Sequence, residues 1–224
     1  MATGYLTFLI PALLGAQLVF SLVLTKGEIC PGQRGRVHKT LPVLLLGWII
    51  ATIAQPFAVL PFLALAFFTV KVKTGKTRDA GPIKALYGAD VLAAFCWLLL
   101  LPSMTLAQTG LSLVSIVLFG ALVGHLLLTQ ARTRLQAFHK ILPFAGFVSG
   151  ILAVLCLCAH MMTLSEQQIS QLTGSFIAAL VLLVAGLLVW VGHILLHKTV
   201  NKWQLLVALA LLILSGAVQL NLFY

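Results

Sequence analysis

The stretch that decides the fold is Leu41–Val70, which reads LPVLLLGWIIATIAQPFAVLPFLALAFFTV. A membrane-spanning helix needs about 20 apolar residues, so this uncharged stretch is too long for one upright helix and short for two. Gln55-Pro56 and Pro61 lie at its middle. Because proline removes a backbone hydrogen bond and kinks or ends a helix, the stretch is either one kinked crossing or a tight hairpin that turns at 55–61.

The basic residues decide between these two arrangements. All fourteen Lys and Arg residues fall into four connections between apolar segments. They are Lys26, Arg34, Arg36 and Lys39 in the first connection, Lys71, Lys73, Lys76, Arg78 and Lys84 in the second, Arg132, Arg134 and Lys140 in the third, and Lys198 and Lys202 in the fourth. If 41–70 crosses twice, all four connections lie on one face, and the positive-inside rule favours that arrangement. A re-entrant hairpin that does not span gives the same sidedness and stays open.

The composition fits a chain whose main solvent is lipid. Hydrophobic residues make up 61% of the 224 residues, charged residues 8%, and the mean hydropathy is +1.12. A soluble domain carries about a quarter charged residues. The remaining apolar segments are 4–24, 85–106, 110–130, 141–163, 172–196 and 203–223. We therefore predict one polytopic membrane domain over 1–224, an all-α integral membrane protein of eight short transmembrane helices with cytoplasmic basic connections and both termini outside.

Charge and small residues indicate the partners. The net charge of +10 lies in the connections, where basic residues meet the anionic cytoplasmic leaflet, so membrane lipids and not nucleic acid are the expected partners. Gly120-x-x-x-Gly124 and Gly146-x-x-x-Gly150 predict close helix packing within the chain. The same pairs are compatible with a homo-oligomer or a membrane partner subunit.

One internal similarity joins two of the basic connections. Residues 123–136, VGHLLLTQARTRLQ, match 191–204, VGHILLHKTVNKWQ, and pair His125 with His193. Two interpretations stay open: helical hairpins repeated in parallel, or two segments that obey the same membrane-interface pattern.

Ionisable groups within the membrane are costly and are therefore candidates for function. Asp90 is a carboxylate within a span, and Tyr87 lies three residues before it on the same helical face. His125 lies near the cytoplasmic end of its helix, and so do His193 and His197. The spacing of His193 and His197 puts both on one face and permits shared metal coordination.

We therefore hypothesise that Asp90, His125 and His193, with Tyr87 nearby, form an acid–base or metal site beneath the cytoplasmic surface. No cofactor is required by the sequence, and a divalent metal at His193 and His197 is compatible with it. The alternative is structural, since histidine is common at the headgroup boundary. His38 and His139 follow or precede basic residues, and we expect both to be solvated.

The layout resembles the lysoplasmalogenase (YhhN-like) family, membrane enzymes of eight short helices found in bacteria and animals. Lys39–Leu44, KTLPVL, is similar to the stretch that opens that family's second helix, and ARTRLQ at 131–136 is similar to its fifth-to-sixth connection. Gly174-Ser175 opens a long penultimate helix, as in that family. The intramembrane Asp motifs of the third and seventh helices are missing, and Gly88-Ala89-Asp90 falls in the next helix instead.

This resemblance implies a hydrolase of lipid metabolism in the bacterial inner membrane that cleaves the ether or vinyl-ether bond of a lysophospholipid, or a divergent member of that family. Two other functions stay open. A small-solute transporter fits the repeated hairpins, and a non-catalytic scaffold or accessory subunit fits the scarcity of polar residues within the spans.

Overall fold

The computed structural model describes residues 4–72, 81–133 and 135–223, without the side chain of Gln136, and all regular structure in these ranges is helical. The elements are α1 Leu6–Lys26, α2 Pro31–His38, α3 Leu41–Ala54, η1 Pro56–Ala58, α4 Val59–Lys71, α5 Ile83–Leu98, η2 Leu101–Ser103, α6 Leu106–Gln130, α7 Gln136–Met161, α8 Glu166–Leu195 and α9 Lys202–Phe223. Four of the basic residues used above, Lys73, Lys76, Arg78 and Arg134, lie outside the described residues.

The stretch 41–70 folds as the tight hairpin that the charges favour. Helix α3 ends at Ala54, Gln55 takes an extended backbone with φ −134° and ψ 99°, and η1 turns the chain into α4. Pro56 opens η1 and Pro61 lies in the first turn of α4, where the missing N–H breaks no helical hydrogen bond. Helices α3 and α4 pack against each other.

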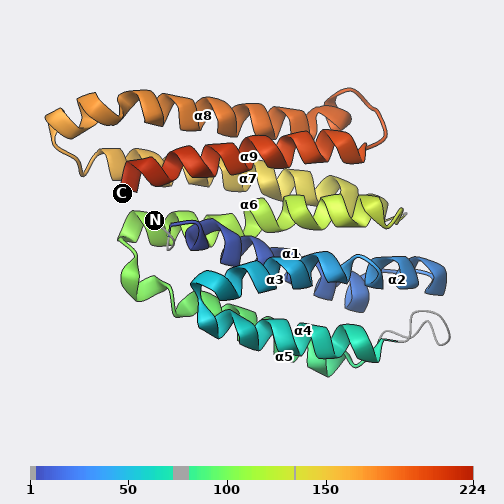
Figure 1. The fold of residues 1–224 in the computed structure, drawn as a ribbon. Coiled ribbons are helices and arrows are strands. Elements are labelled where there is room, and N and C mark those ends of the chain that lie inside the picture. The colour runs from blue at the N-terminus through green and yellow to red at the C-terminus, as the bar shows by residue number, and fades with distance from the viewer. Residues whose placement is uncertain (1–3, 73–80, 134, 224) are drawn as a thin grey trace.

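Two central helices divide the molecule. Helices α1 and α6 lie side by side, with α3, α4 and α5 on one side and α7, α8 and α9 on the other (Figure 1). Successive long helices alternate in direction, so the described basic connections gather at one end and both chain ends at the other (Figure 1). The described residues therefore form seven helices long and apolar enough to span a membrane and one shorter apolar helix, Pro56–Lys71, in the predicted order, and by the positive-inside rule the basic end is cytoplasmic.

Lipid is the natural solvent for the outer helices. Large apolar side chains point outward from α3 to α5 and from α7 to α9, among them Ile53 at 83% exposed and Val70 at 80% exposed. By contrast, α1 and α6 are mostly covered by other helices: in each of them, 72% of the most apolar 18 residues is buried. The chain thus encloses two of its helices and leaves the others an apolar face for lipid.

Paired glycines bring the two central helices together. A Cβ atom on Gly15 would lie 1.8 Å from the carbonyl oxygen of Ile116, and one on Gly120 would lie 2.4 Å from the Cα of Gly15. Gly124 likewise faces Val19. The predicted close packing of 120–124 within the chain is confirmed.

Several helices extend beyond the apolar segments that predicted them. Helix α8 begins at Glu166 and not at 172, because the Ser165 hydroxyl accepts from the backbone N–H of Gln168 and the Gln168 side chain accepts from the N–H of Ser165. The same capping box at Thr105 and Gln108 begins α6. Such caps satisfy N–H groups that have no partner within the helix, so the helix continues past its apolar part.

Candidate functional site

Two hydrogen-bonded clusters contain the buried Asp90 and the buried His125 and His193, one in each half of the molecule. The first surrounds Asp90 on α5, whose carboxylate accepts from Gln17 Nε2 at 2.9 Å and from Ser21 Oγ at 2.6 Å. Both donors lie on α1. The Gln17 side-chain oxygen in turn accepts from the Trp48 indole of α3 at 3.0 Å, so this cluster ties three helices together.

The sequence hypothesis placed Asp90 in one site with His125 and His193. The structure instead places Asp90 in a separate cluster with Gln17 and Ser21. Its carboxylate is 8% exposed and both of its oxygens already accept hydrogen bonds. Tyr87, one turn earlier on α5, is 47% exposed and points outward. The Asp90 cluster consequently has the character of a buried structural network that fixes α1, α3 and α5.

The second cluster is built from three histidines around Trp190. The Trp190 indole of α8 donates to His125 Nδ1 on α6 at 2.9 Å, and His125 Nε2 lies 2.9 Å from His139 Nδ1 on α7. His139 Nε2 lies 3.3 Å from the carbonyl oxygen of Thr133. Because indole only donates and a carbonyl only accepts, the neutral tautomers are fixed: His125 donates from Nε2 to His139, which donates from Nε2 to Thr133.

His193 completes this cluster. Its Nδ1 lies 2.8 Å from the Trp190 carbonyl oxygen, to which it must donate, and its ring centroid is 5.6 Å from that of His125. The side chain is 6% exposed, and its Nε2 has no hydrogen-bond partner among the described residues. His125 and His193, paired by the internal similarity, thus meet in space.

His197 does not join them. Helix α8 ends at Leu195, and His197 is exposed with φ 50°, in the left-handed region. The prediction that His193 and His197 share one helical face is wrong, because the chain leaves the helix between them.

The geometry does not favour metal at the histidine cluster either. The described residues include no group of three or more His, Cys, Asp or Glu side chains placed to hold a metal ion. The indole N–H facing His125 Nδ1 leaves the proton on Nε2, so His125 offers no free lone pair to a cation.

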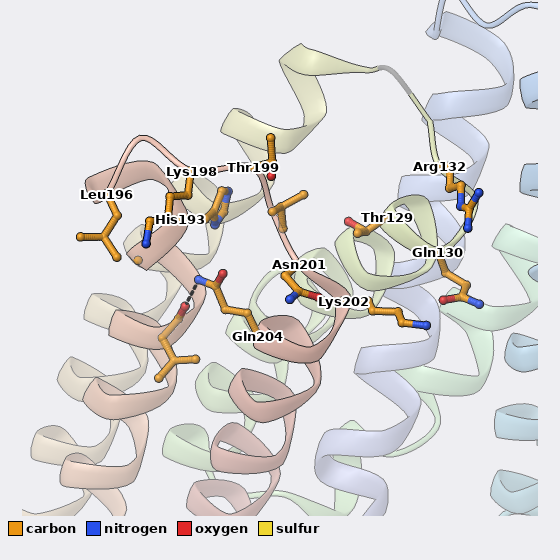
Figure 2. Close-up of a pocket in the computed structure, with 13 residues that line it drawn as sticks. Thr129, Gln130, Arg132, His193, Leu196, Lys198, Thr199, Asn201, Lys202 and Gln204 are labelled. Carbon is orange, nitrogen blue, oxygen red and sulfur yellow. Dashed lines mark hydrogen bonds between the residues drawn. The ribbon is translucent and has the colours of Figure 1, made fainter.

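A polar pocket of about 930 Å³ opens at the cytoplasmic end beside His193 (Figure 2). Its lining comes from the end of α6, the end of α8, the connection between α8 and α9, and the first turn of α9. The polar lining residues are Thr129, Gln130, Arg132, His193, Lys198, Thr199, Asn201, Lys202 and Gln204. None of the residues that line it is acidic, so the pocket carries uncompensated positive charge.

Sequence reasoning missed two buried histidines. His139 is half-buried in the cluster, and His38 is 3% exposed with its ring edge against Phe68. The expectation that both are solvated is wrong. A signal was available, because His-Lys-x-Leu-Pro occurs at 38–42 and again at 139–143, where each histidine stands at the cytoplasmic start of a span.

The comparisons with known proteins give a family and no solved relative. The chain is 28% identical over 202 residues to an uncharacterized protein of Haemophilus influenzae, an alignment that covers 85% of this chain and 74% of the relative. No solved structure matches this chain significantly. Residues 3–220 match the sequence model of a family described as an integral membrane domain. This match covers nearly the whole chain, and the protein belongs to that family of integral membrane domains.

Proposed function

We propose that the protein is a membrane-embedded hydrolase of lysoplasmalogenase type that acts on a vinyl-ether lysophospholipid at the inner leaflet of a bacterial plasma membrane. The observation that carries the proposal is His193, a buried imidazole whose Nε2 has no partner among the described residues and which lines the cationic pocket. Histidine is the side chain that most often acts as a general acid or base in enzymes.

The chemistry needs one group that gives and takes back a proton. In the protonated form of His193, Nε2 gives its proton to the alkene carbon of the vinyl ether, which leaves an oxocarbenium carbon next to the ether oxygen. Water adds to that carbon, and Nε2 takes back a proton from this water. The hemiacetal formed then breaks into a fatty aldehyde and the glycerophospho-alcohol, so one water is consumed and His193 is regenerated.

The neighbours of His193 act by positioning it. The Trp190 carbonyl oxygen accepts from Nδ1, which orients the ring and stabilises the imidazolium when Nε2 is protonated. The Trp190 indole is itself held by its hydrogen bond to His125. His125, His139 and Trp190 are therefore positioning residues in this proposal, and His193 is the catalytic residue.

Release of fatty aldehyde tests the proposal. Purified protein in detergent is given a vinyl-ether lysophospholipid, and aldehyde is measured by mass spectrometry for the wild type and for His193→Gln. Loss of a positioned acid–base group costs about 10²- to 10⁴-fold in rate, so the variant is expected to fall by that factor.

His197→Gln is the matched control, because His197 is exposed and does not line the pocket. It should keep wild-type turnover, and thermal unfolding should show both variants folded. Absence of aldehyde from the wild type, or full turnover by a folded His193→Gln variant, would contradict the hydrolase proposal.

A transporter for a small anionic solute is the second candidate. The observation that favours it is the repeated arrangement of α6–α7 and α8–α9, two hairpins whose cytoplasmic turns both line the pocket. It predicts solute flux into proteoliposomes without product formation. A chain that neither releases aldehyde nor moves solute is left as a non-catalytic subunit that should co-purify with a membrane partner.

A further inference from the structure

An apolar groove lies between α1 and α9, at the end of the molecule that carries both chain termini (Figure 1). Both helices pack against α6 but scarcely contact each other, so α6 forms the floor of the groove. The volume of the groove is about 530 Å³, which is within the range of ligand pockets in proteins. By the positive-inside rule this end of the molecule faces away from the cytoplasm.

The lining of the groove is apolar and uncharged. One wall is a face of α1 within residues 5–13, and the other is a face of α9 within residues 209–221. Among the described residues that line the groove, the polar side chains are those of Tyr5 and Asn221, and both stand at the outer ends of their helices. The groove therefore has a neutral polar mouth and an interior of hydrocarbon side chains.

Gly216 keeps the middle of the groove open. A Cβ atom on Gly216 would lie 3.6 Å from Phe8 Cδ2 and 3.7 Å from Phe119 Cζ, which is ordinary van der Waals contact. At Gly15 and Gly120, by contrast, the facing backbone leaves no room for a Cβ atom. Close helix packing thus does not require a glycine at 216, although glycine is a poor helix former. Its effect is to leave free space beside the two phenylalanine rings.

The dimensions of the groove select a narrow occupant. Residues 209–221 span about 18 Å along α9 at a rise of about 1.5 Å per residue. Over this length, the volume of the groove corresponds to a mean cross-section of about 30 Å². An α-helix with its side chains is about 10–12 Å across, a cross-section of about 80 Å² or more. The groove is therefore too narrow for a helix of a second copy or of another protein, whereas a single hydrocarbon chain fits.

The membrane supplies such a chain. Ile213 and Ala217 line the groove and are exposed, so the groove opens toward lipid. The hydrocarbon of one leaflet is about 15 Å deep, half of the bilayer core, which is close to the length of the groove. Water is not stable in a cavity that offers it few polar partners.

Charge at the mouth separates a lipid from a free fatty acid. The carboxylate of a fatty acid would need a positive partner when it leaves water, and the described lining residues include no cation. Tyr5 and Asn221 are neutral hydrogen-bonding groups, which suit the ester region of a lipid whose charged headgroup stays in water.

We propose that the groove between α1 and α9 binds one acyl chain of a phospholipid from the outer leaflet, with the ester region of that lipid beside Tyr5 and Asn221. The bound chain completes the packing between α1 and α9. This site is independent of the proposed hydrolysis, because His193 lies at the cytoplasmic end of α8 and the groove lies at the opposite end of the bundle.

Lipid binding is measured by native mass spectrometry of the purified full chain in detergent, with palmitoyl-oleoyl phosphatidylcholine as the probe. This lipid has no net charge, so the basic cytoplasmic end does not attract it. The wild type should retain one molecule of the lipid. Glycerophosphocholine, which has the same headgroup without acyl chains, should not bind.

Gly216→Leu should weaken binding of the lipid by at least about tenfold, because the new side chain takes the place of about two buried methylene groups of the ligand. Ala12→Leu fills the groove from α1 and should have the same effect, so the test does not depend on the folding of one variant. Gly174→Leu is the matched control, because a Cβ atom there meets no heavy atom within 4 Å and Gly174 does not line the groove. It should bind the lipid as the wild type does.

Three results would overturn the proposal: no phosphatidylcholine retained by the wild type, unchanged binding by both folded groove variants, or equal binding of glycerophosphocholine. A wild-type dimer that Gly216→Leu and Ala12→Leu convert to a monomer would identify a second copy as the occupant, and would overturn the proposal as well.

Discussion

At the scale of residues, Trp190 has two functions in the histidine cluster. Its indole N–H binds His125, and its carbonyl oxygen binds His193. Because indole cannot accept a proton, the chain from Trp190 through His125 to His139 has a fixed direction and stops at Trp190. We therefore assign this chain to orientation and not to proton conduction, and we expect proton exchange only at His193 Nε2.

The Asp90 cluster gives a prediction that separates structure from catalysis. In Asp90→Asn the amide oxygen can still accept from Gln17, and the Ser21 hydroxyl can turn to accept from the new NH₂ group. This variant should fold and keep its activity. In Asp90→Leu both donors lose their acceptor, and each unsatisfied buried group costs about 1–3 kcal/mol.

Thermal unfolding in detergent measures the difference, with Tyr87→Phe as a control because Tyr87 is exposed on the same helix. Asp90→Leu should unfold at a clearly lower temperature, and the other two variants should match the wild type. A folded but inactive Asp90→Asn variant would show that Asp90 takes part in catalysis.

The sequence identified Asp90, His125 and His193 as costly groups, and all three are buried. It could not assign their partners, because helical spacing fixes only which residues share a face of one helix. The Trp48–Gln17–Asp90 contacts depend on how α1, α3 and α5 pack. His139 was missed because its basic neighbour Lys140 made the segment look solvated.

At the scale of elements, Gly146 decides how closely α7 approaches α8. A Cβ atom on Gly146 would lie 2.0 Å from Trp190 Cζ3, and the Trp190 side chain is fully buried. Gly146→Ala must therefore push the ring away and strain its hydrogen bond to His125. We expect this overpacking to lower the free energy of unfolding by about 1–3 kcal/mol. Because the displaced Trp190 no longer positions His193, the rate of aldehyde release should fall as well.

Gly174→Ala on α8 is the comparison variant, since no heavy atom lies within 4 Å of its added Cβ and alanine favours a helix over glycine. Thermal unfolding in detergent should show a lower transition temperature for Gly146→Ala alone. Equal transition temperatures for the two variants would mean that the contact between Gly146 and Trp190 is not tight in solution.

The existence of six spans followed from apolar length and that of the 41–70 hairpin from the basic residues, but the helix ends followed from neither. Ser165 and Thr105 extend α8 and α6 through capping boxes, and a hydropathy window does not detect caps. Helix α2 formed where a basic connection was expected, with Pro31 at its first position, a place that proline favours.

At the scale of the whole molecule, the distribution of positive charge carried more information than hydropathy. Helices α3 and α4 have 14 and 13 residues, too few for two standard spans, and by length the structure has seven candidate spans with Pro56–Lys71 as a shorter apolar helix. Only the placement of all four basic connections on one face of the membrane predicted that 41–70 folds as a hairpin. That sidedness also brings Arg132 and Lys198 to one pocket.

The eight-span fold and the inner-leaflet site both depend on this topology, which side-specific labelling of single cysteines measures directly. In a variant without Cys30, Cys96, Cys156 and Cys158, one cysteine is placed at Phe57 in η1, at Ser165, or at Thr199 in the pocket. A membrane-impermeant maleimide is applied to intact and permeabilised cells. We predict labelling of positions 57 and 165 in intact cells, and of position 199 only after permeabilisation. Labelling of 57 from the same side as 199, or of 165 and 199 from one side, would contradict the eight-span fold and the inner-leaflet site.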